Sequence, residues 1–110
     1  MKFDEGLTYE DVLLVPQYSD IRSRSEINIG STLPGPYATM RLSVPIIASP
    51  MDTVSESEMG AAMWRSGALA VIHRYNTIIH QVHLVDEVIV GANANVAAAI
   101  GTSGDYLERA

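Results

Sequence analysis

The segment from Val44 to Thr53 constrains the fold of this chain most, because it joins an apolar run to a helix start through a polar, proline-braced exit. The apolar run indicates a strand covered on both faces, as in a parallel sheet, and Pro50 ends that strand. Beyond it, Ser55 followed three residues later by Glu58 predicts a capping box at the start of a helix. The segment therefore predicts a βα unit whose connecting loop carries polar residues.

The same strand-to-helix pattern recurs along the chain. A helix over residues 56–65, ended by Gly67, leads to an apolar run over 68–72 and a second polar exit. A second helix follows the candidate cap Thr77, and residues 96–100 predict a third strand. Strands that alternate with helices pair in parallel through right-handed crossovers. The pattern predicts an α/β fold. Both a barrel and a doubly wound sheet fit it, although no glycine-rich dinucleotide loop follows any strand.

The part of the chain ahead of these units has a different pattern. Residues 12–15 form a β-rich run closed by a proline and predict a short strand. Residues 27–29 are predicted to pair with residues 40–43, across a segment rich in turn residues. Residues 33–36 are predicted to be a loop, since their two prolines would remove donors from a ladder.

Three blocks of the sequence resemble the IMP dehydrogenase and GMP reductase family. They are Leu-Thr-Tyr-Glu-Asp-Val-Leu-Leu-Val-Pro at residues 7–16, Ser-Pro-Met-Asp-Thr-Val at 49–54 and Val-Ile-His-Arg at 71–74. They occur in the family's order and at fitting separations. The resemblance covers residues 7–87 well and resumes more weakly over 96–110.

The resemblance favours the barrel over the doubly wound sheet. It implies the amino-terminal portion of a (β/α)8 TIM barrel, because a whole barrel needs about 250 residues and this chain supplies about two and a half βα units. Residues 1–43 would then be a pre-barrel segment and residues 44–110 the first units. Only a turn separates residue 87 from residue 96. The pair of regulatory cystathionine-β-synthase modules that interrupts typical IMP dehydrogenases is therefore not expected.

The resemblance also implies a nucleotide pocket at the ends of the first two strands. Ser49 and Met51 match family residues that line it, offering a hydroxyl for phosphate or ribose oxygens and a flexible apolar surface for a purine. Asp52 and His73 are further candidates for substrate contact, and Arg74 could attract an anionic nucleotide. The residues alone also allow structural roles: Ser49 as a turn cap, Met51 in the core and Asp52 at a helix start. His73 would then be a hydrogen-bonded core residue.

Thr102 and Ser103 match positions that contact the adenosine part of NAD in some family members. Their hydroxyls could equally cap the helix expected from Asp105. His80 and His83 share a helical face, but we expect no metal site without a third ligand. The family's monovalent-cation site and its cysteine nucleophile are not expected in this chain, which contains no cysteine. No catalytic residue is therefore assigned.

Three hypotheses about function follow from the resemblance. The first is a fragment of an IMP dehydrogenase, which oxidises IMP to XMP with NAD, and the pair Ser49-Pro50 favours it because reductases commonly differ there. The second is a fragment of a GMP reductase, which converts GMP to IMP with NADPH, and the lack of regulatory modules favours that. The third is a non-catalytic chain that associates with full-length barrels. We expect the 110-residue chain alone to be inactive and its full-length parent to be a homotetramer.

The composition argues against several other classes of function. The formal net charge is −6, from 13 acidic and 7 basic residues, so non-specific nucleic-acid binding is not expected. No apolar run approaches membrane-spanning length, and neither a signal sequence nor a disulfide framework is visible. We therefore expect a cytoplasmic protein whose partner is IMP or another purine nucleotide.

Overall fold

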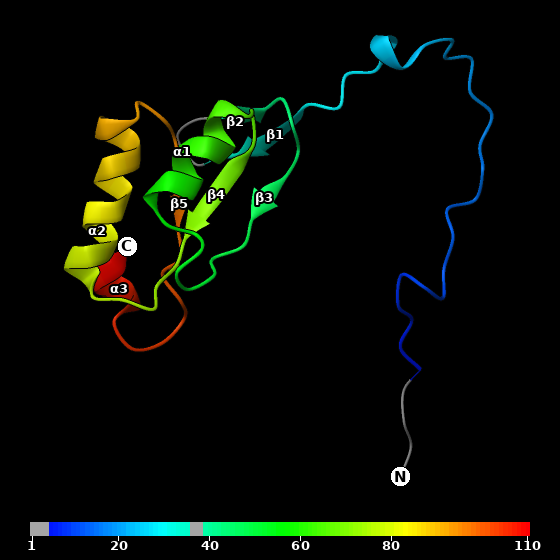
Figure 1. The fold of residues 1–110 in the computed structure, drawn as a ribbon. Coiled ribbons are helices and arrows are strands. Elements are labelled where there is room, and N and C mark those ends of the chain that lie inside the picture. The colour runs from blue at the N-terminus through cyan, green and yellow to red at the C-terminus, as the bar shows by residue number, and fades with distance from the viewer. Residues whose placement is uncertain (1–4, 36–38) are drawn as a thin grey trace.

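A small α/β body follows a long extended segment in this chain. A computed structural model describes residues 5–35 and 39–110. Its elements, in chain order, are η1 (Arg24–Glu26), β1 (Ser31–Pro34), β2 (Thr39–Leu42), β3 (Ile47–Ala48), α1 (Ser57–Arg65), β4 (Leu69–Ile72), α2 (Ile78–Asp86), η2 (Glu87–Gly91), β5 (Ala97–Ala98) and α3 (Tyr106–Arg109). Residues 5–30, ahead of β1, run outside the body as an extended trace (Figure 1).

Three parallel strands form the centre of the body, in the order β3-β4-β5. The paired residues are Ile47↔Leu69 and Ala48↔Ala70 between β3 and β4, and Val71↔Ala97 and Ile72↔Ala98 between β4 and β5. The predicted parallel α/β order is confirmed. β3 is shorter than its apolar run because Pro45 has no N–H to donate and the Ile46 N–H bonds to the Val44 carbonyl, at 2.8 Å. The closure of these strands into a barrel stays a prediction.

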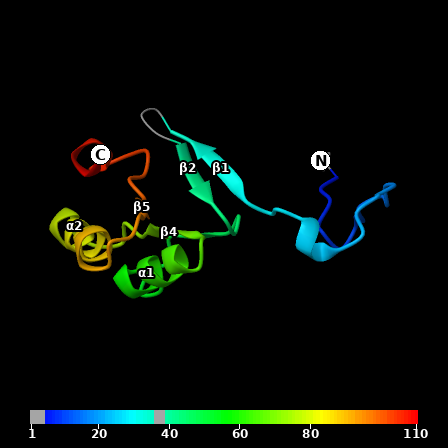
Figure 2. The same cartoon turned by 90° about the horizontal axis from the view of Figure 1, so that it is seen from above.

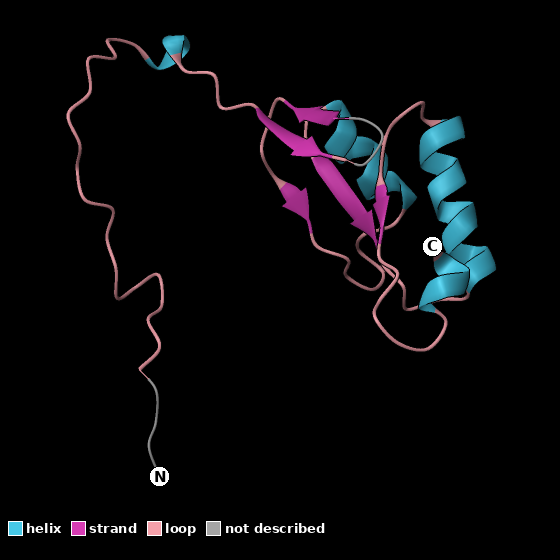
Figure 3. Cartoon of the chain, turned by 180° about the vertical axis from the view of Figure 1, so that it is seen from behind, coloured by secondary structure: helices cyan, strands magenta, loops and turns pink. Residues whose placement is uncertain are grey.

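The core lies between this sheet and the helices. α1 and α2 lie on one side of the sheet and the β1–β2 hairpin on the other (Figure 2), and α2 packs beside β4 and β5 (Figure 3). Ala70 and Ile72 of β4 are completely buried, as is Val88 of η2. In contrast, Ile46 and Ile47 are about half exposed, at 57% and 48%. The prediction that the apolar run after Val44 is covered on both faces is therefore wrong among the described residues, since β3 is an edge strand of the sheet.

The β1–β2 hairpin differs from its prediction. β1 and β2 are antiparallel, with Ser31 opposite Leu42 and Pro34 opposite Thr39. The prediction that residues 27–29 pair with residues 40–43 is therefore wrong. The predicted loop over 33–36 is also wrong at its first two residues, which end β1. Proline is tolerated there because β1 is an edge strand and Pro34 is its last residue. Residue 36 lies outside the described residues.

The predicted strand over residues 12–15 is wrong as well. This segment is extended, but no strand among the described residues pairs with it. Leu13 and Leu14 are 93% and 97% exposed. An apolar, β-rich run specifies an extended backbone, but a strand also needs a neighbour to accept its hydrogen bonds.

Both helix ends that were predicted from single residues are confirmed. Gly67 ends α1 with a φ of +80°, and its N–H donates to the Trp64 carbonyl at 2.9 Å. The Thr77 hydroxyl caps α2 by accepting the N–H of His80 at 3.2 Å. The predicted capping box, however, is wrong, because the cap position of α1 is Glu56 and no side chain bonds there.

A short connection, residues 92–96, joins η2 to β5 at the amino-terminal ends of the strands. Asn93 is exposed in it and takes a φ of 48°. The buried Ala94 donates its N–H to the carbonyl of Val88 at 3.1 Å, which fixes where the connection re-enters the core. Across residues 5–35 and 39–110, no helix has the length and apolar character that a bilayer crossing requires.

The close packing at Gly67 makes a stability prediction. Gly67→Ala should lower the free energy of unfolding by about 1–2 kcal/mol or more, because a Cβ there would collide with the Ser43 side chain and would have to adopt a left-handed backbone conformation. Urea unfolding followed by the fluorescence of the single tryptophan, Trp64, measures the change. Gly91→Ala is the matched control, since a Cβ at Gly91 meets nothing within 4 Å. Equal midpoints for the two variants would contradict the packing at Gly67.

Candidate functional site

The loops that follow β3, β4 and β5 leave the same end of the sheet, since parallel strands share the direction of their carboxyl ends (Figure 1). In open and closed parallel sheets this is the end at which ligands bind. All the predicted site residues are on these three loops: Ser49, Met51 and Asp52 after β3, His73 after β4, and Thr102 and Ser103 after β5. The topology thus places both halves of the predicted site at one end of the molecule.

A buried serine holds the loop after β3. The Ser55 side chain is 1% exposed, and its hydroxyl donates to the Ser49 carbonyl and accepts the Met51 N–H at 3.2 Å. The Ser55 N–H also donates to the Met51 carbonyl, at 2.9 Å. Thr53 takes a φ of 59°, which is uncommon for a β-branched residue and sharpens the turn. The backbone of this loop is therefore fixed by the residue that sequence analysis assigned to a helix cap.

With the backbone held from inside, the side chains of the loop face outward. Met51 is 55% exposed, and Ser49 and Asp52 are also exposed. The structure thus leaves the Ser49 hydroxyl and the Met51 thioether accessible at the carboxyl end of the sheet. This arrangement suits ligand contact, because the backbone has little freedom left to lose when a ligand binds.

His73 is placed differently from the other substrate candidates. Its side chain is 2% exposed, and its Nδ1 accepts the N–H of Tyr75 at 3.2 Å. Nε2 therefore carries the proton, and it faces Glu56 Oε1 at 3.4 Å and Asp52 Oδ1 at 3.9 Å. The backbone N–H of His73 also donates to the Ser55 carbonyl at 3.4 Å. His73 thus joins the loop after β4 to the loop after β3 and to the start of α1, from a buried position.

Thr102 and Ser103 are on an exposed loop that begins at a glycine. Gly101 has a φ of +79°, and a Cβ there would lie 3.1 Å from the guanidinium carbon of Arg74. The positive charge of Arg74 therefore covers the start of the loop that carries both hydroxyls. The alternative role of the two hydroxyls, as helix caps, is wrong, because Asp105 is at the cap position of α3 and no side chain bonds there.

A group of polar side chains that the sequence pattern did not predict lies behind these loops. Gln81 of α2 is 4% exposed and bonds to the carbonyls of His73 and Ala99, and Arg109 of α3 bonds to the Gln81 side chain. The sequence feature that could have indicated this group is a glutamine on the apolar face of a helix, between Ile78 and Leu84. Buried polar side chains are rare unless they are hydrogen-bonded, so such a position indicates a specific set of partners.

The first block of the resemblance forms a local turn far from these loops. Asp11 Oδ2 accepts the backbone N–H of Thr8 at 2.8 Å and its hydroxyl at 2.9 Å. The backbone hydrogen bond, and then the hydroxyl, lower the pKa of the Asp11 carboxyl. The structure therefore assigns these residues a turn, with no described contact to the candidate site.

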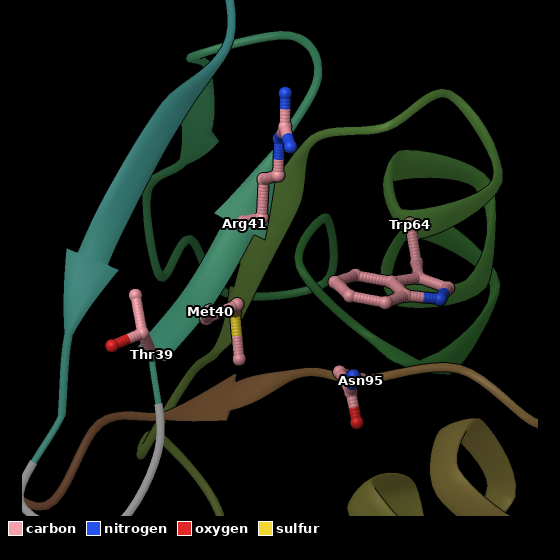
Figure 4. A pocket seen from close by; sticks show the side chains of 5 residues that line it. All are labelled: Thr39, Met40, Arg41, Trp64 and Asn95. Atoms are coloured by element: carbon pink, nitrogen blue, oxygen red, sulfur yellow. The ribbon is translucent and has the colours of Figure 1, made fainter.

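A pocket of about 390 Å³ is at the opposite end of the strands. It lies between β2, the end of α1 and the segment before β5, and its lining residues are Thr39, Met40, Arg41, Trp64 and Asn95. The Arg41 guanidinium and the Thr39 hydroxyl point away from the indole of Trp64 (Figure 4). Because these polar groups do not converge on one point, the carboxyl end of the sheet remains the candidate site.

Comparison with known proteins identifies one family. A sequence profile described as "IMP dehydrogenase / GMP reductase domain" matches residues 6–110. Inosine-5'-monophosphate dehydrogenase of Nitrosopumilus maritimus is 46% identical over 85 residues, which cover 77% of this chain and 17% of that protein. A crystal structure of a GMP reductase variant from Trypanosoma brucei has a TM-score of 0.71 at 42% identity, covering 81% of this chain and 20% of that one. The GMP reductase from Trypanosoma brucei in complex with guanosine 5'-triphosphate has a TM-score of 0.68 at 42% identity. The match covers 77% of this chain and 19% of that one. The chain spans about a fifth of the length of these relatives.

The clamp made by Ser55 gives a testable difference between two serines of the same loop. Ser55→Ala should lower the free energy of unfolding by about 1–3 kcal/mol, because it leaves the Met51 N–H and the Ser49 carbonyl without their buried partner. Ser49→Ala removes an exposed hydroxyl and should change the free energy of unfolding by less than about 0.5 kcal/mol. Urea unfolding of both variants checks the prediction. A Ser55→Ala variant as stable as Ser49→Ala would show that the loop is held in another way.

Proposed function

The chain belongs to the IMP dehydrogenase / GMP reductase family, and on this premise we propose that residues 44–110 form the first βα units of a family TIM barrel, with residues 1–43 ahead of it. In this proposal the carboxyl end of the sheet is part of a purine nucleotide site whose substrate is IMP. One observation supports it most: the loop clamped by Ser55 presents Ser49 and Met51 to solvent at that end. The activity is proposed for the complete barrel enzyme.

The roles of the substrate residues follow from their chemistry and exposure. The Ser49 hydroxyl exchanges a hydrogen bond with a ribose or phosphate oxygen of the nucleotide. The Met51 thioether packs against the purine ring, since a flexible, polarisable side chain adapts to a flat aromatic surface. Asp52 is exposed beside them and contributes negative charge near the ribose side of the ligand. His73, which is buried, acts on the substrate only by holding Asp52 and Glu56 in place.

The dinucleotide half of the site is proposed on the loop after β5. A bound NAD would supply the hydride acceptor for the oxidation of the purine. The exposed hydroxyls of Thr102 and Ser103 fit polar atoms of its adenosine part, and the Arg74 guanidinium beside Gly101 supplies positive charge for an anionic cofactor. The donor set therefore fits a dinucleotide, and these residues bind and orient it.

This chain's share of the mechanism is binding and positioning. The resemblance implies a covalent adduct between a cysteine and the purine, but none of the 110 residues is a cysteine. The Ser49 hydroxyl has no described histidine or carboxylate partner that could activate it, so it serves as a binding group. The nucleophile is therefore proposed to come from another part of the barrel, and the full enzyme is proposed to be a homotetramer.

Two activities of the family remain candidates. We favour the dehydrogenase because of the pair Ser49-Pro50, and Nitrosopumilus maritimus IMP dehydrogenase, at 46% identity, agrees with that choice. The reductase is the second candidate, because the two solved relatives at 42% identity are both GMP reductases. A non-catalytic chain that associates with full-length barrels is the third.

The first test of this proposal is nucleotide binding. Ser49→Ala in the complete enzyme should weaken IMP binding about tenfold, because one hydrogen bond to a charged ligand is lost. Met51→Ala should weaken it by a similar factor through lost contact with the purine. Isothermal titration with IMP measures both, and Ser31→Ala, an exposed serine of the distant hairpin, is the matched control. Folded Ser49→Ala and Met51→Ala variants with wild-type IMP affinity would remove these residues from the site.

The second test is the direction of the reaction. The complete enzyme should form NADH from NAD in the presence of IMP, and it should not oxidise NADPH in the presence of GMP. Absorbance at the reduced-nicotinamide band follows both reactions in parallel. Oxidation of NADPH with GMP, together with release of ammonia, would make the protein a reductase and would show that the Ser49-Pro50 argument is wrong.

A further inference from the structure

The exits of β4 and β5 share one buried side chain. After the Ala99 N–H donates to the Ile72 carbonyl at 3.0 Å, the two strands separate into their loops. The next carbonyls, those of His73 and Ala99, both accept from Gln81 Nε2, at 3.1 Å and 2.8 Å. Gln81 therefore replaces the sheet hydrogen bonds at the point where the sheet ends.

The other end of the same amide meets α3. Gln81 Oε1 accepts from Arg109 Nη1 at 2.9 Å. The orientation of the amide is thus fixed, because a flip would place its oxygen against two carbonyl oxygens and its NH₂ against a guanidinium. A buried amide with both donors and its acceptor occupied tolerates almost no displacement of its partners.

Arg109 connects this amide to two more parts of the site end. Its side chain is 6% exposed, its Nε donates to Asp105 Oδ2 at 2.8 Å, and its Nη2 donates to the Asn76 carbonyl at 2.6 Å. α3 has only four residues and could not hold its place by helix formation alone. Arg109 therefore fixes α3 against the loop after β4.

Together these bonds close the loop after β5 at both ends. Gln81 holds it at Ala99, and Arg109 holds it at Asp105, with Thr102 and Ser103 between the two anchors. We propose that Gln81 and Arg109 are positioning residues that set the loop carrying Thr102 and Ser103 against the loop after β4, and so shape the dinucleotide half of the site. This proposal rests on the proposed function, and neither residue is required to touch a ligand.

The first experiment tests the junction itself in the 110-residue chain, without any ligand. Gln81→Met keeps the length of the side chain but removes all three hydrogen bonds. It should speed the amide hydrogen exchange of Ala99, Glu108 and Arg109 by about tenfold, the effect of losing one to two net hydrogen bonds. The Gly60 amide in α1 is the internal reference and should not change. Unchanged exchange at all three amides, or equal acceleration at Gly60, would overturn the proposal.

The second experiment tests the consequence for the site in the complete enzyme. Gln81→Met should raise the KM for the dinucleotide about tenfold while the affinity for IMP changes by less than about twofold. A merely structural role would move both constants together or lower only the melting temperature. His83→Gln, an exposed residue on the same helix, is the matched control. If Gln81→Met does not fold, Arg109→Lys replaces it, since lysine keeps the charge beside Asp105 but cannot hold three acceptors in a fixed fork.

The two experiments separate this proposal from the proposed function. A wild-type enzyme that neither binds IMP nor turns over would contradict the proposed function. Hydrogen exchange of the Ala99, Glu108 and Arg109 amides would still show whether Gln81 and Arg109 hold the loop after β5. Wild-type dinucleotide KM in a folded Gln81→Met enzyme, or parallel changes for both ligands, would show that Gln81 does not position the cofactor loop.

Discussion

The hydrogen bonds of β4 on both of its edges hold the rest of the body in place. Its first two residues pair with β3 and its last two pair with β5, so the three strands are staggered. Because of this stagger the loop after β3 begins two residues earlier, relative to β4, than the loop after β5. The Ser55 carbonyl can then reach the His73 N–H. Both halves of the candidate site thus take their spacing from four residues, 69–72, which are apolar and largely buried.

Where the sheet ends, side chains supply the hydrogen-bond partners that neighbouring strands supply within the sheet. Backbone groups that leave a sheet lose their partners and, when buried, need others. Ser55 supplies them for the loop after β3, and Gln81 supplies them for the loops after β4 and β5. Both of these side chains are uncharged, whereas the loop after β5 is held further on by the ion pair of Arg109 with Asp105. The charged side chains of Asp52 and Arg74 are exposed at the same end.

The local features of the sequence predicted the repetitive part of the fold well. The alternation of apolar runs with helices gave the parallel order, and Gly67 and Thr77 marked their helix ends because each acts within one turn. Two of the predictions that failed depended on partners more distant in the sequence. The extended run at residues 12–15 has no neighbouring strand among the described residues, and residues 31–34, rather than 27–29, pair with residues 39–42. In the site, exposure of Ser49 could be predicted from its motif, but the inward role of Ser55 could not, since a capping box and a loop clamp use the same residue type.

The connection between η2 and β5 has a consequence for how proteins of this architecture can vary. It lies at the end of the strands opposite the candidate site, and the bond from Ala94 to Val88 fixes the chain again before β5 begins. Extra residues between Ala92 and Asn93 would project into solvent and leave every loop at the carboxyl end unmoved. One extra residue between His73 and Thr77 would instead break the register of Gln81 with two carbonyls. An insertion between η2 and β5, even of a whole accessory module, is therefore compatible with an unchanged candidate site. An insertion in the loop after β4 is not.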